Sequence, residues 1–342
     1  MKYLEHLYSS KNKIVLYFNS SVYFCNNLKI SNLNCHELQV VDSINIYKFR
    51  ALALLKKRLM KKYTELLYLT ITFLFILSSC DVIEEPYMNK QTIVNDTNQT
   101  VYTKKVLVED YTGQKCGNCP RAHEKMTELI GIYQNKIIPL AVHVGFFAIP
   151  SSSPYTTDYR SAVGNDLNNY FKNSNAGMPN GMVNRTELSG DVILQFANWE
   201  QVVQSQLALE PEINIGIENT YNSTSKSLQS IITLTSLKDF NQTLKLCVYL
   251  KEDSLVSAQM DYEKTPSDIL NYTHRNVLRD AINSTWGEIV SDQNIINKQV
   301  ITKTFNYTLN SQYKPENCYV LAYVYYDDTK QIIQADERKI IY

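Results

Sequence analysis

The sequence has little glycine or proline and no excess of either charge. Its 342 residues include only 10 Gly and 9 Pro against 44% hydrophobic residues, which excludes a disordered or collagen-like chain. Its 34 basic and 34 acidic side chains give a formal net charge of zero, and no run of five Lys or Arg occurs. The chain therefore lacks the electrostatic footprint of a DNA- or RNA-binding protein, and nucleic acid is not an expected partner.

Cysteine is also scarce. Seven Cys are too few for a disulfide-stapled scaffold of this length, and an odd number leaves at least one sulfur with another role. The length exceeds what one hydrophobic core usually spans, so two folded domains are expected.

A short apolar segment with a basic start precedes one of these cysteines. From Met60 the chain reads MKKYTELLYLTITFLFILSSC, with an apolar run of about twelve residues before Cys80. This layout is typical of a bacterial lipoprotein signal, in which the cysteine thiol receives a diacylglycerol before cleavage. The alternative, a membrane-spanning helix, needs roughly twenty apolar residues. The sequence therefore predicts a lipid anchor at Cys80, which makes a membrane one partner of the protein.

The predicted signal divides the N-terminal part of the chain. Residues 60–79 are the signal peptide, and residues 1–59 are interpreted as an upstream extension from a start codon assigned too early, so Cys25 and Cys35 carry no function. A genuine cytoplasmic extension is the alternative for that segment. Residues 80–103 are polar and show neither helical nor strand periodicity, which predicts a flexible tether.

Strand-like and helix-like patterns alternate over residues 104–209. The patterns predict strands at Val106–Val108, Ile137–Val144 and Met182–Val183, and helices at Cys119–Tyr133, Asp158–Phe171 and Trp199–Leu209. Strands that alternate with helices indicate an α/β domain whose parallel or mixed sheet is covered on its faces.

Residues 210–342 carry short β-rich runs separated by polar turns. This spacing predicts an antiparallel β-sandwich domain, with one helix around His274–Ile282. Cys247 and Cys318 fall on separate predicted strands. They either form a structural disulfide or stay buried and unpaired, and the sequence leaves both open.

A cluster of polar and aromatic residues lies in and after the predicted helix of this domain, at His274, Arg275, Arg279 and Trp286-Gly287-Glu288. One interpretation is a binding site. The other, which we favour, is a helix with solvated basic residues and a tryptophan packed on the edge of the sandwich.

The residues Cys116-Gly117-Asn118-Cys119-Pro120 follow a predicted strand and open a predicted helix. Two cysteines three apart at a helix N-terminus can close a small disulfide ring, and the free backbone N–H groups and helix dipole stabilise a thiolate on the first. We therefore expect Cys116 to be the exposed nucleophile and Cys119 the buried resolving thiol. The alternative is a structural disulfide without redox activity.

Other chemistry fits this cysteine pair less well. A zinc ribbon needs a second pair of cysteines at ribbon spacing, and haem attachment needs a histidine where Pro120 stands. His123 and His143 could complete a copper site with the two cysteines. However, His123 is more typical of a solvated helix face and His143 of a hydrogen-bonded core residue. No metal or organic cofactor is therefore expected.

The segment VLVEDYTGQKCGNCPRAHEKM resembles the active-site strand, turn and helix of thioredoxin-like proteins, over residues 104–209. In that family a buried acid six positions before the first cysteine relays protons, and Asp110 occupies its place. The family also has a cis-proline that faces the disulfide, and Met178-Pro179 fits it, which implies that an incoming chain pairs with the Met178 backbone. The sequence departs from the family at Lys115, where tryptophan is usual, so substrate docking is expected to differ.

The chain after Cys80 also resembles a narrower group, the twenty-eight-kilodalton outer membrane protein family of surface lipoproteins. The residues that carry this resemblance are EDYTGQKCGNCPRAH, GMPNGMVNR and NYTHRNVLRDAINSTWGE, and it covers most of residues 104–342. It implies a thioredoxin-like domain followed by a β-rich domain on a lipoprotein of the cell outer membrane. The biochemical role that it implies is poorly defined.

Together these features predict a thioredoxin-like α/β domain followed by an antiparallel β-sandwich domain on a lipid-anchored protein. The predicted activity is thiol–disulfide exchange by Cys116 and Cys119, with Asp110 assisting proton removal. The expected partners are disulfide-containing envelope proteins and a membrane reductase that supplies electrons. The alternative is a surface adhesin or structural lipoprotein that uses the thioredoxin fold as a non-catalytic scaffold.

Overall fold

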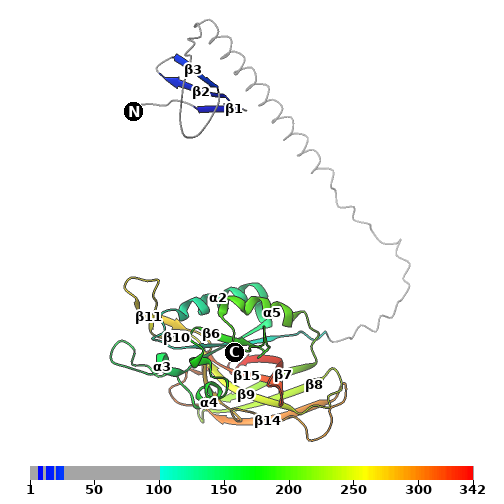
Figure 1. Cartoon of the computed structure of the whole chain (residues 1–342). Helices are drawn as coiled ribbons and strands as arrows, with labels where there is room; N and C mark the ends of the chain where they lie inside the picture. Colours follow the sequence, from blue (N-terminus) through cyan, green and yellow to red (C-terminus); the bar gives the residue numbers. More distant parts are fainter. Residues whose placement is uncertain (1–6, 11–12, 19–20, 27–100, 342) are drawn as a thin grey trace, which may run out of the picture. The chain divides into compact units, whose positions relative to one another are not determined.

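The structure is a computed structural model that describes residues 7–10, 13–18, 21–26 and 101–341 (Figure 1). The chain divides into two units, Met1–Asn95 and Asp96–Tyr342. The predicted signal peptide, Cys80 and most of the predicted tether lie outside the described residues. In the first unit the described residues form an antiparallel three-stranded sheet of β1 (Leu7–Ser10), β2 (Lys13–Phe18) and β3 (Ser21–Asn26).

The second unit is a mixed α/β structure in which most strand pairs are antiparallel. Its helices are α2 (Cys119–Tyr133), α3 (Gly145–Ala148), α4 (Ala162–Phe171) and α5 (Trp199–Leu207). Its strands are β4 (Val106–Thr112), β5 (Ile137–His143), β6 (Asn180–Val183), β7 (Ile213–Asn222), β8 (Ser227–Ser236), β9 (Leu244–Glu252), β10 (Leu255–Met260), β11 (Asp268–His274), β12 (Val277–Ala281), β13 (Glu288–Ile289), β14 (Val300–Thr308), β15 (Cys318–Tyr326) and β16 (Ile332–Lys339).

An eight-stranded sheet forms the centre of this unit. Its strands run in the order β16-β15-β9-β12-β5-β4-β6, and β13 pairs with β9 beside them. β5 is parallel to both β4 and β12, whereas the other pairs of this sheet are antiparallel. A three-stranded sheet in the order β14-β8-β7 and a two-stranded sheet of β10 and β11 complete the unit.

Helices and the three-stranded sheet cover the large sheet. α2 and α5 pack on β4 and β6 through an apolar cluster that contains Leu129 and Trp199, and Figure 1 shows both helices on one side of the sheet. The residues of β4 and β5 that point to the other face of the sheet pack against Val163 and Leu167 of α4. At the other end of the sheet, β7 and β8 share a third cluster with β9 and β15.

Several predicted elements of residues 104–209 are confirmed. The predicted helix Cys119–Tyr133 matches α2, and the three predicted strands match β4, β5 and β6. α4 begins at Ala162 rather than at Asp158, because the Ser161 side chain accepts a hydrogen bond from the Gly164 N–H and caps the helix there. No helix in the described part of the chain is both long and apolar enough to cross a membrane.

The predicted helix at His274–Ile282 is wrong. His274 ends β11, and Val277–Ala281 forms β12. β12 pairs with β9 on one side and with β5 on the other. Strand pairing between distant segments therefore overrides the local helical pattern.

The predicted domain boundary between residues 209 and 210 falls between strands that share one sheet. β4, β5 and β6 precede the boundary, and β9, β12, β13, β15 and β16 follow it. β12 connects the two sets by pairing with β5 and β9. The two stretches of chain are thus joined by strand hydrogen bonds, in addition to their covalent link.

The structural disulfide considered for Cys247 and Cys318 does not form, and both cysteines are buried and free. Cys247 pairs with Tyr323 and Cys318 with Glu252 across β9 and β15, which places the cysteines five positions apart in register. At roughly 3.3 Å per residue this separation exceeds the reach of a disulfide, and an odd number of positions places the two side chains on opposite faces of the sheet.

A buried ion pair links β4 to the C-terminal half of the chain. Arg185 donates from Nε and Nη2 to the two carboxylate oxygens of Glu109, at 3.0 and 2.9 Å, and both side chains are fully buried. Arg185 Nη2 also donates to the Tyr323 hydroxyl on β15, at 3.1 Å. Removing one partner would leave the other charge buried and uncompensated.

We expect Glu109→Ala to lower the free energy of unfolding by about 3–5 kcal/mol, because it leaves the Arg185 guanidinium buried without its counter-charge. Urea denaturation of the purified variant at neutral pH measures the effect. Glu288→Ala is the matched control, since Glu288 pairs with Lys303 at the surface and its loss should cost less than about 1 kcal/mol. Equal effects of the two substitutions would contradict a structural role for the buried pair.

Candidate functional site

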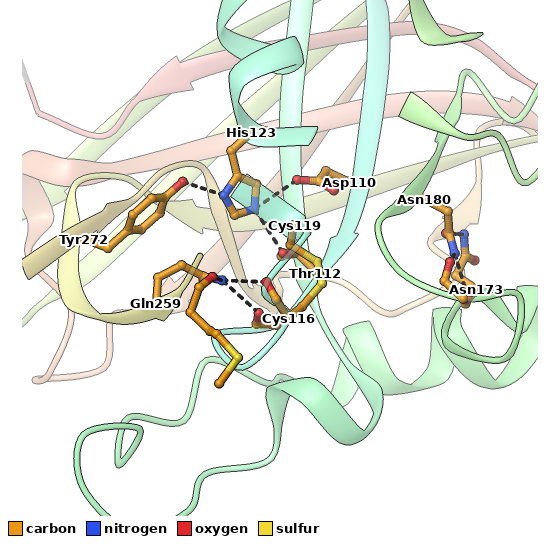
Figure 2. The surroundings of a disulfide bond; sticks show 12 residues. Asp110, Thr112, Cys116, Cys119, His123, Asn173, Asn180, Gln259 and Tyr272 are labelled. Carbon is orange, nitrogen blue, oxygen red and sulfur yellow. Dashed lines mark hydrogen bonds and ion pairs between the residues drawn. A yellow bond between two sulfur atoms is a disulfide. The ribbon is translucent and has the colours of Figure 1, made fainter. Parts of the chain in front are cut away.

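The predicted cysteine pair lies in the loop that joins β4 to α2. The Cys116 N–H donates to the Gly113 carbonyl at 3.0 Å, and the Cys119 N–H donates to the Cys116 carbonyl at 3.1 Å. These two turns bring the cysteines together, and a disulfide joins them with their Cα atoms 5.3 Å apart (Figure 2). Pro120 stands in the first turn of α2, as predicted.

The hairpin of β10 and β11 covers this loop. Gln259 Nε2 donates to the Cys116 carbonyl at 3.0 Å, and the Tyr262 N–H donates to the Gly117 carbonyl at 2.9 Å. The Tyr262 ring lies against Gly117, where even a Cβ atom would approach the ring to 2.5 Å. Cys116 is consequently only 3% exposed. The prediction of an exposed Cys116 is therefore wrong for this structure, because a distant segment of the chain covers it.

Charged contacts hold the tip of the hairpin to α2. Arg121 pairs with Asp261 at 2.9 Å and with Glu263 at 2.6 Å, both in the turn between β10 and β11. The Tyr155 hydroxyl donates to Asp268 at the start of β11. Because Glu263 is exposed and Arg121 partly so, these contacts are partly screened by solvent and each contributes modestly.

Asp110 lies on β4, and its side chain is 3% exposed. One carboxylate oxygen, Oδ2, is 3.4 Å from His123 Nε2, and the other, Oδ1, has no hydrogen-bond partner within residues 101–341. Burial raises the pKa of this carboxyl to about 8. The structure therefore places a mostly protonated acid at neutral pH where the thioredoxin resemblance implies one.

His123 lies between Asp110 and the hairpin. Its Nε2 is 3.0 Å from Thr112 Oγ1, and its Nδ1 is 2.6 Å from the Tyr272 hydroxyl on β11 (Figure 2). Burial, together with the positive charges that His274 and Arg121 can carry, lowers the pKa of His123 to about 3, so the ring is uncharged at neutral pH. The prediction of a solvated His123 is wrong, because the hairpin packs on that face of α2.

Two further histidines lie beside this group. His143 on β5 and His274 on β11 are buried with their ring centroids 5.5 Å apart, and neither ring nitrogen of His143 has a hydrogen-bond partner in the described residues. Burial lowers the pKa of both, to about 4 for His274. The expected core hydrogen bond of His143 is thus not formed. His274 was singled out in the sequence, but only as part of a cluster for which we favoured solvated residues.

A cavity of about 560 Å³ borders these residues. Its lining includes Asp110, His123, His143, Tyr272 and His274, together with further polar and apolar residues of α2, β5 and the segment after β11. Tyr272 lies in the segment NYTHRNVLRDAINSTWGE that carries the family resemblance, but the sequence analysis did not single it out as a site residue. No three His, Cys, Asp or Glu side chains between residues 101 and 341 are grouped as metal ligands.

The proline loop lies at the same end of the sheet as the disulfide loop. The Met178–Pro179 bond is cis, in agreement with the thioredoxin resemblance. β6 begins directly after it, with Asn180 opposite Tyr111 near the end of β4. Asn180 Nδ2 donates to the Asn173 carbonyl at 2.8 Å, which ties the loop to the segment after α4.

The remaining residues singled out in the sequence make contacts away from the sulfur atoms. Lys115 places its ammonium 4.9 Å from the centroid of the Phe146 ring. Arg279 pairs with Glu252 at 3.4 Å, and Trp286 packs against the rings of Tyr170 and Phe171. Arg279 and Trp286 therefore have structural contacts.

Comparison with known proteins gives one family match. The family model described as outer membrane protein Omp28 matches residues 165–341. The comparison with curated proteins found no match.

The chain is similar to several solved structures, of which two are described. One is the crystal structure of a protein from Agrobacterium tumefaciens, with 12% identity and a TM-score of 0.45, covering 70% of this chain and 95% of the other. The second is a domain of the outer membrane lipoprotein Omp28 from Porphyromonas gingivalis, with 20% identity and a TM-score of 0.27, covering 38% of this chain and 88% of the other.

We expect Asp110→Asn to stabilise the oxidised protein at neutral pH and to have little effect near pH 4. The pKa of Asp110 is about 8 in the folded protein and 3.8 in the unfolded chain, so between these values the folded protein binds a proton that the unfolded chain releases. The native carboxyl therefore costs stability that grows as the pH rises from about 4 to about 8. The expected gain near pH 7 is on the order of 4 kcal/mol, since one pKa unit corresponds to about 1.4 kcal/mol.

Urea denaturation of the oxidised protein at about pH 4 and about pH 7 checks this expectation. Asp292→Asn, at an exposed position, serves as the control and should change little at either pH. A gain that is the same at both pH values would show that Asp110 does not carry a raised pKa.

Proposed function

Because the chain belongs to the Omp28 outer membrane protein family, we propose that it is a lipid-anchored envelope protein whose Cys116–Cys119 pair exchanges disulfides with other envelope proteins. The observation that carries the proposal is a disulfide at the start of α2 with the buried acid Asp110 on the adjoining strand. The lipoprotein signal predicted before Cys80 supports attachment to the outer membrane.

The proposal includes a thioredoxin-like arrangement around the pair. β4, the disulfide loop, α2 and the parallel strand β5 follow one another in the chain, and β6 with its cis-proline pairs antiparallel to β4. This arrangement supports a thioredoxin-like fold for residues 104–209. The apolar cluster between β7–β8 and β9–β15 supports the sandwich proposed for residues 210–342.

In the proposed reaction, a dithiol reductase at the membrane first reduces the pair. The Cys116 thiolate then attacks one sulfur of a substrate disulfide, and the other substrate sulfur leaves as a thiolate that takes a proton from solvent. When Asp110 is in its ionised form, which is the minor one at neutral pH, Cys119 loses its proton to that carboxylate and attacks Cys116 Sγ. This re-forms the Cys116–Cys119 disulfide and releases the second substrate sulfur as a thiolate. Two electrons pass from the cysteine pair to the substrate disulfide.

This reaction requires movement of the β10–β11 hairpin. Cys116 is covered in the oxidised protein, so a substrate disulfide reaches it only when the Gln259 and Tyr262 hydrogen bonds to the loop open. The Arg121 ion pairs must lengthen as well. A closed and an open position of the hairpin would then control access to the pair.

One observation favours a second function. The same burial of Cys116 is what a purely structural disulfide would show, with the fold serving as the scaffold of a surface adhesin or structural lipoprotein. The two functions differ in whether Cys116 reacts with external thiols and disulfides, and that reactivity can be measured.

We expect Cys119→Ala to accumulate mixed disulfides through Cys116. The substitution removes the resolving thiol, so the complex formed when Cys116 attacks a substrate disulfide persists. Non-reducing electrophoresis of envelope extracts from cells that express the full chain reveals such complexes. Added dithiothreitol should separate them by reducing the mixed disulfide. Cys318→Ala, which removes a buried free thiol on β15, should trap nothing. If Cys119→Ala traps no complex, the exchange function is contradicted and the structural function is the one that stands.

We expect Arg121→Ala to speed reduction of the disulfide by dithiothreitol about five- to tenfold. The substitution removes two partly exposed ion pairs that hold the hairpin over Cys116, each worth up to about 1 kcal/mol. Quenching with an alkylating reagent and measuring mass over time gives the rate. Lys303→Ala, which removes an ion pair on β14, should leave it unchanged. An unaltered rate in Arg121→Ala would show that these contacts do not limit access.

A further inference from the structure

A continuous chain of polar contacts leads from Asp110 to the hairpin that covers the disulfide. Asp110 Oδ2 is 3.4 Å from His123 Nε2, and His123 Nδ1 is 2.6 Å from the Tyr272 hydroxyl (Figure 2). The three side chains come from β4, α2 and β11. These polar contacts therefore connect the buried Asp110 on β4 to Tyr272, which is half-buried.

Asp110 needs such a connection if it accepts a proton from Cys119. Its side chain is 3% exposed, and within residues 101–341 its Oδ1 has neither exposed surface nor a hydrogen-bond partner. A proton held there must leave before the next reaction cycle. His123 is placed to receive it, because Nε2 faces the carboxyl while Nδ1 faces away from it.

We propose that His123 and Tyr272 are positioning residues that pass protons between Asp110 and the surface during thiol–disulfide exchange. This inference rests on the exchange activity proposed above and adds the route by which its proton leaves.

One tautomer of His123 allows one proton to move from Asp110 to solvent. With its hydrogen on Nδ1, the ring donates to the Tyr272 oxygen. Nε2 is then an acceptor, and it must turn from the Thr112 hydroxyl, 3.0 Å away, to take the proton of Asp110. The protonated Asp110 gives its proton to Nε2 as Nδ1 gives its own to Tyr272, and the tyrosine hydroxyl releases its hydrogen to water. Because the distance from Oδ2 to Nε2 is longer than an ordinary hydrogen bond, the carboxyl must first rotate slightly. Asp110 ends as a carboxylate, and one proton has reached solvent.

The surroundings favour passage of the proton over its storage on His123. Burial and the charges that His274 and Arg121 can carry make the imidazolium unfavourable, so a proton that arrives at one nitrogen is best matched by one that leaves the other. The titratable and charged groups that face His123 and Tyr272 are Asp110 on β4, Arg121 and Glu124 on α2, His143 on β5, Asp261 in the hairpin turn, and His274 on β11.

The cavity of about 560 Å³ is where the proton route meets the surface of the protein. His123 and Tyr272 both line it, beside Thr273 and Arg275 of the segment that follows the hairpin turn. Arg275 is exposed, so this part of the cavity lies at the surface. The Tyr272 hydroxyl can therefore exchange its proton with solvent without unfolding of the site.

The test separates the two chemical steps of the reaction. Reduced protein is mixed with 5,5′-dithiobis(2-nitrobenzoate), an aromatic disulfide, and the release of its coloured thiolate is followed by stopped flow. Attack by Cys116 releases one thiolate and leaves a mixed disulfide, and attack by Cys119 on that disulfide releases the second. The first phase reports the proposed activity, and the second reports deprotonation of Cys119.

We expect Tyr272→Phe and His123→Gln to slow the second phase at least about tenfold near pH 7 without slowing the first, because proton removal from Cys119 loses its route. In the wild-type protein the second phase should rise with pH and level off once Asp110 is ionised. In both variants it should keep rising with pH, since hydroxide then replaces the route. Tyr307→Phe, which removes a tyrosine hydroxyl bonded to Asp280 on a distant strand, is the matched control and should leave both phases unchanged.

Three results would overturn the inference, and they are distinguishable. A wild-type second phase in both variants would show that protons leave Asp110 by another path. A faster first phase with no slowing of the second would show that Tyr272 and His123 only hold the hairpin over Cys116. A wild-type protein that releases no thiolate would remove the exchange activity itself, and the proton route with it.

Discussion

The position of β12 between β5 and β9 is the constraint on which the site depends. β12 joins β5, which with β4 flanks the Cys116–Cys119 pair in the chain, to β9, which lies far along the chain. The Ala141 N–H donates to the Asn276 carbonyl at 2.8 Å, and Lys251 Nζ donates to the Asn276 side chain at 2.9 Å. Because β11 ends only two residues before Asn276, these bonds also fix where the β10–β11 hairpin ends and help to hold it over α2.

A hairpin held in this way changes the chemistry of the loop beneath it. It covers Cys116, and beside it Asp110, His143 and His274 are buried while His123 is partly so. Low polarity favours the neutral form of every ionisable group, which is why the pKa of the acid rises while the pKa values of His123, His143 and His274 fall. The result is a group of uncharged proton donors and acceptors beside a disulfide, an arrangement suited to moving protons without separating charge.

The same hairpin creates a conflict between protection and reactivity. Backbone and side-chain hydrogen bonds from Gln259 and Tyr262 shield the disulfide, whereas exchange needs the sulfur to meet another chain. The contacts at the hairpin tip are ion pairs near the surface, which are weak individually and sensitive to salt. By contrast, the Glu109–Arg185 pair that connects the sheet to β15 is fully buried. The fold is thus firmly joined at its centre, while the cover of the site is held by contacts that can open.

The sequence by itself determined the features that depend on near neighbours in the chain. The helical spacing of Cys119–Tyr133 and the cysteine pair at its start follow from local pattern, and the structure has α2 over the same residues with the disulfide at its start. The acid at Asp110 was expected only from the thioredoxin resemblance. Only the tertiary structure decided that Cys116 is covered, that His123 contacts Tyr272, and that Cys247 and Cys318 lie on opposite faces of a sheet. Each of these depends on which distant strands pair and in what register, and that choice is made by burial of the whole sheet, which no local period of the sequence encodes.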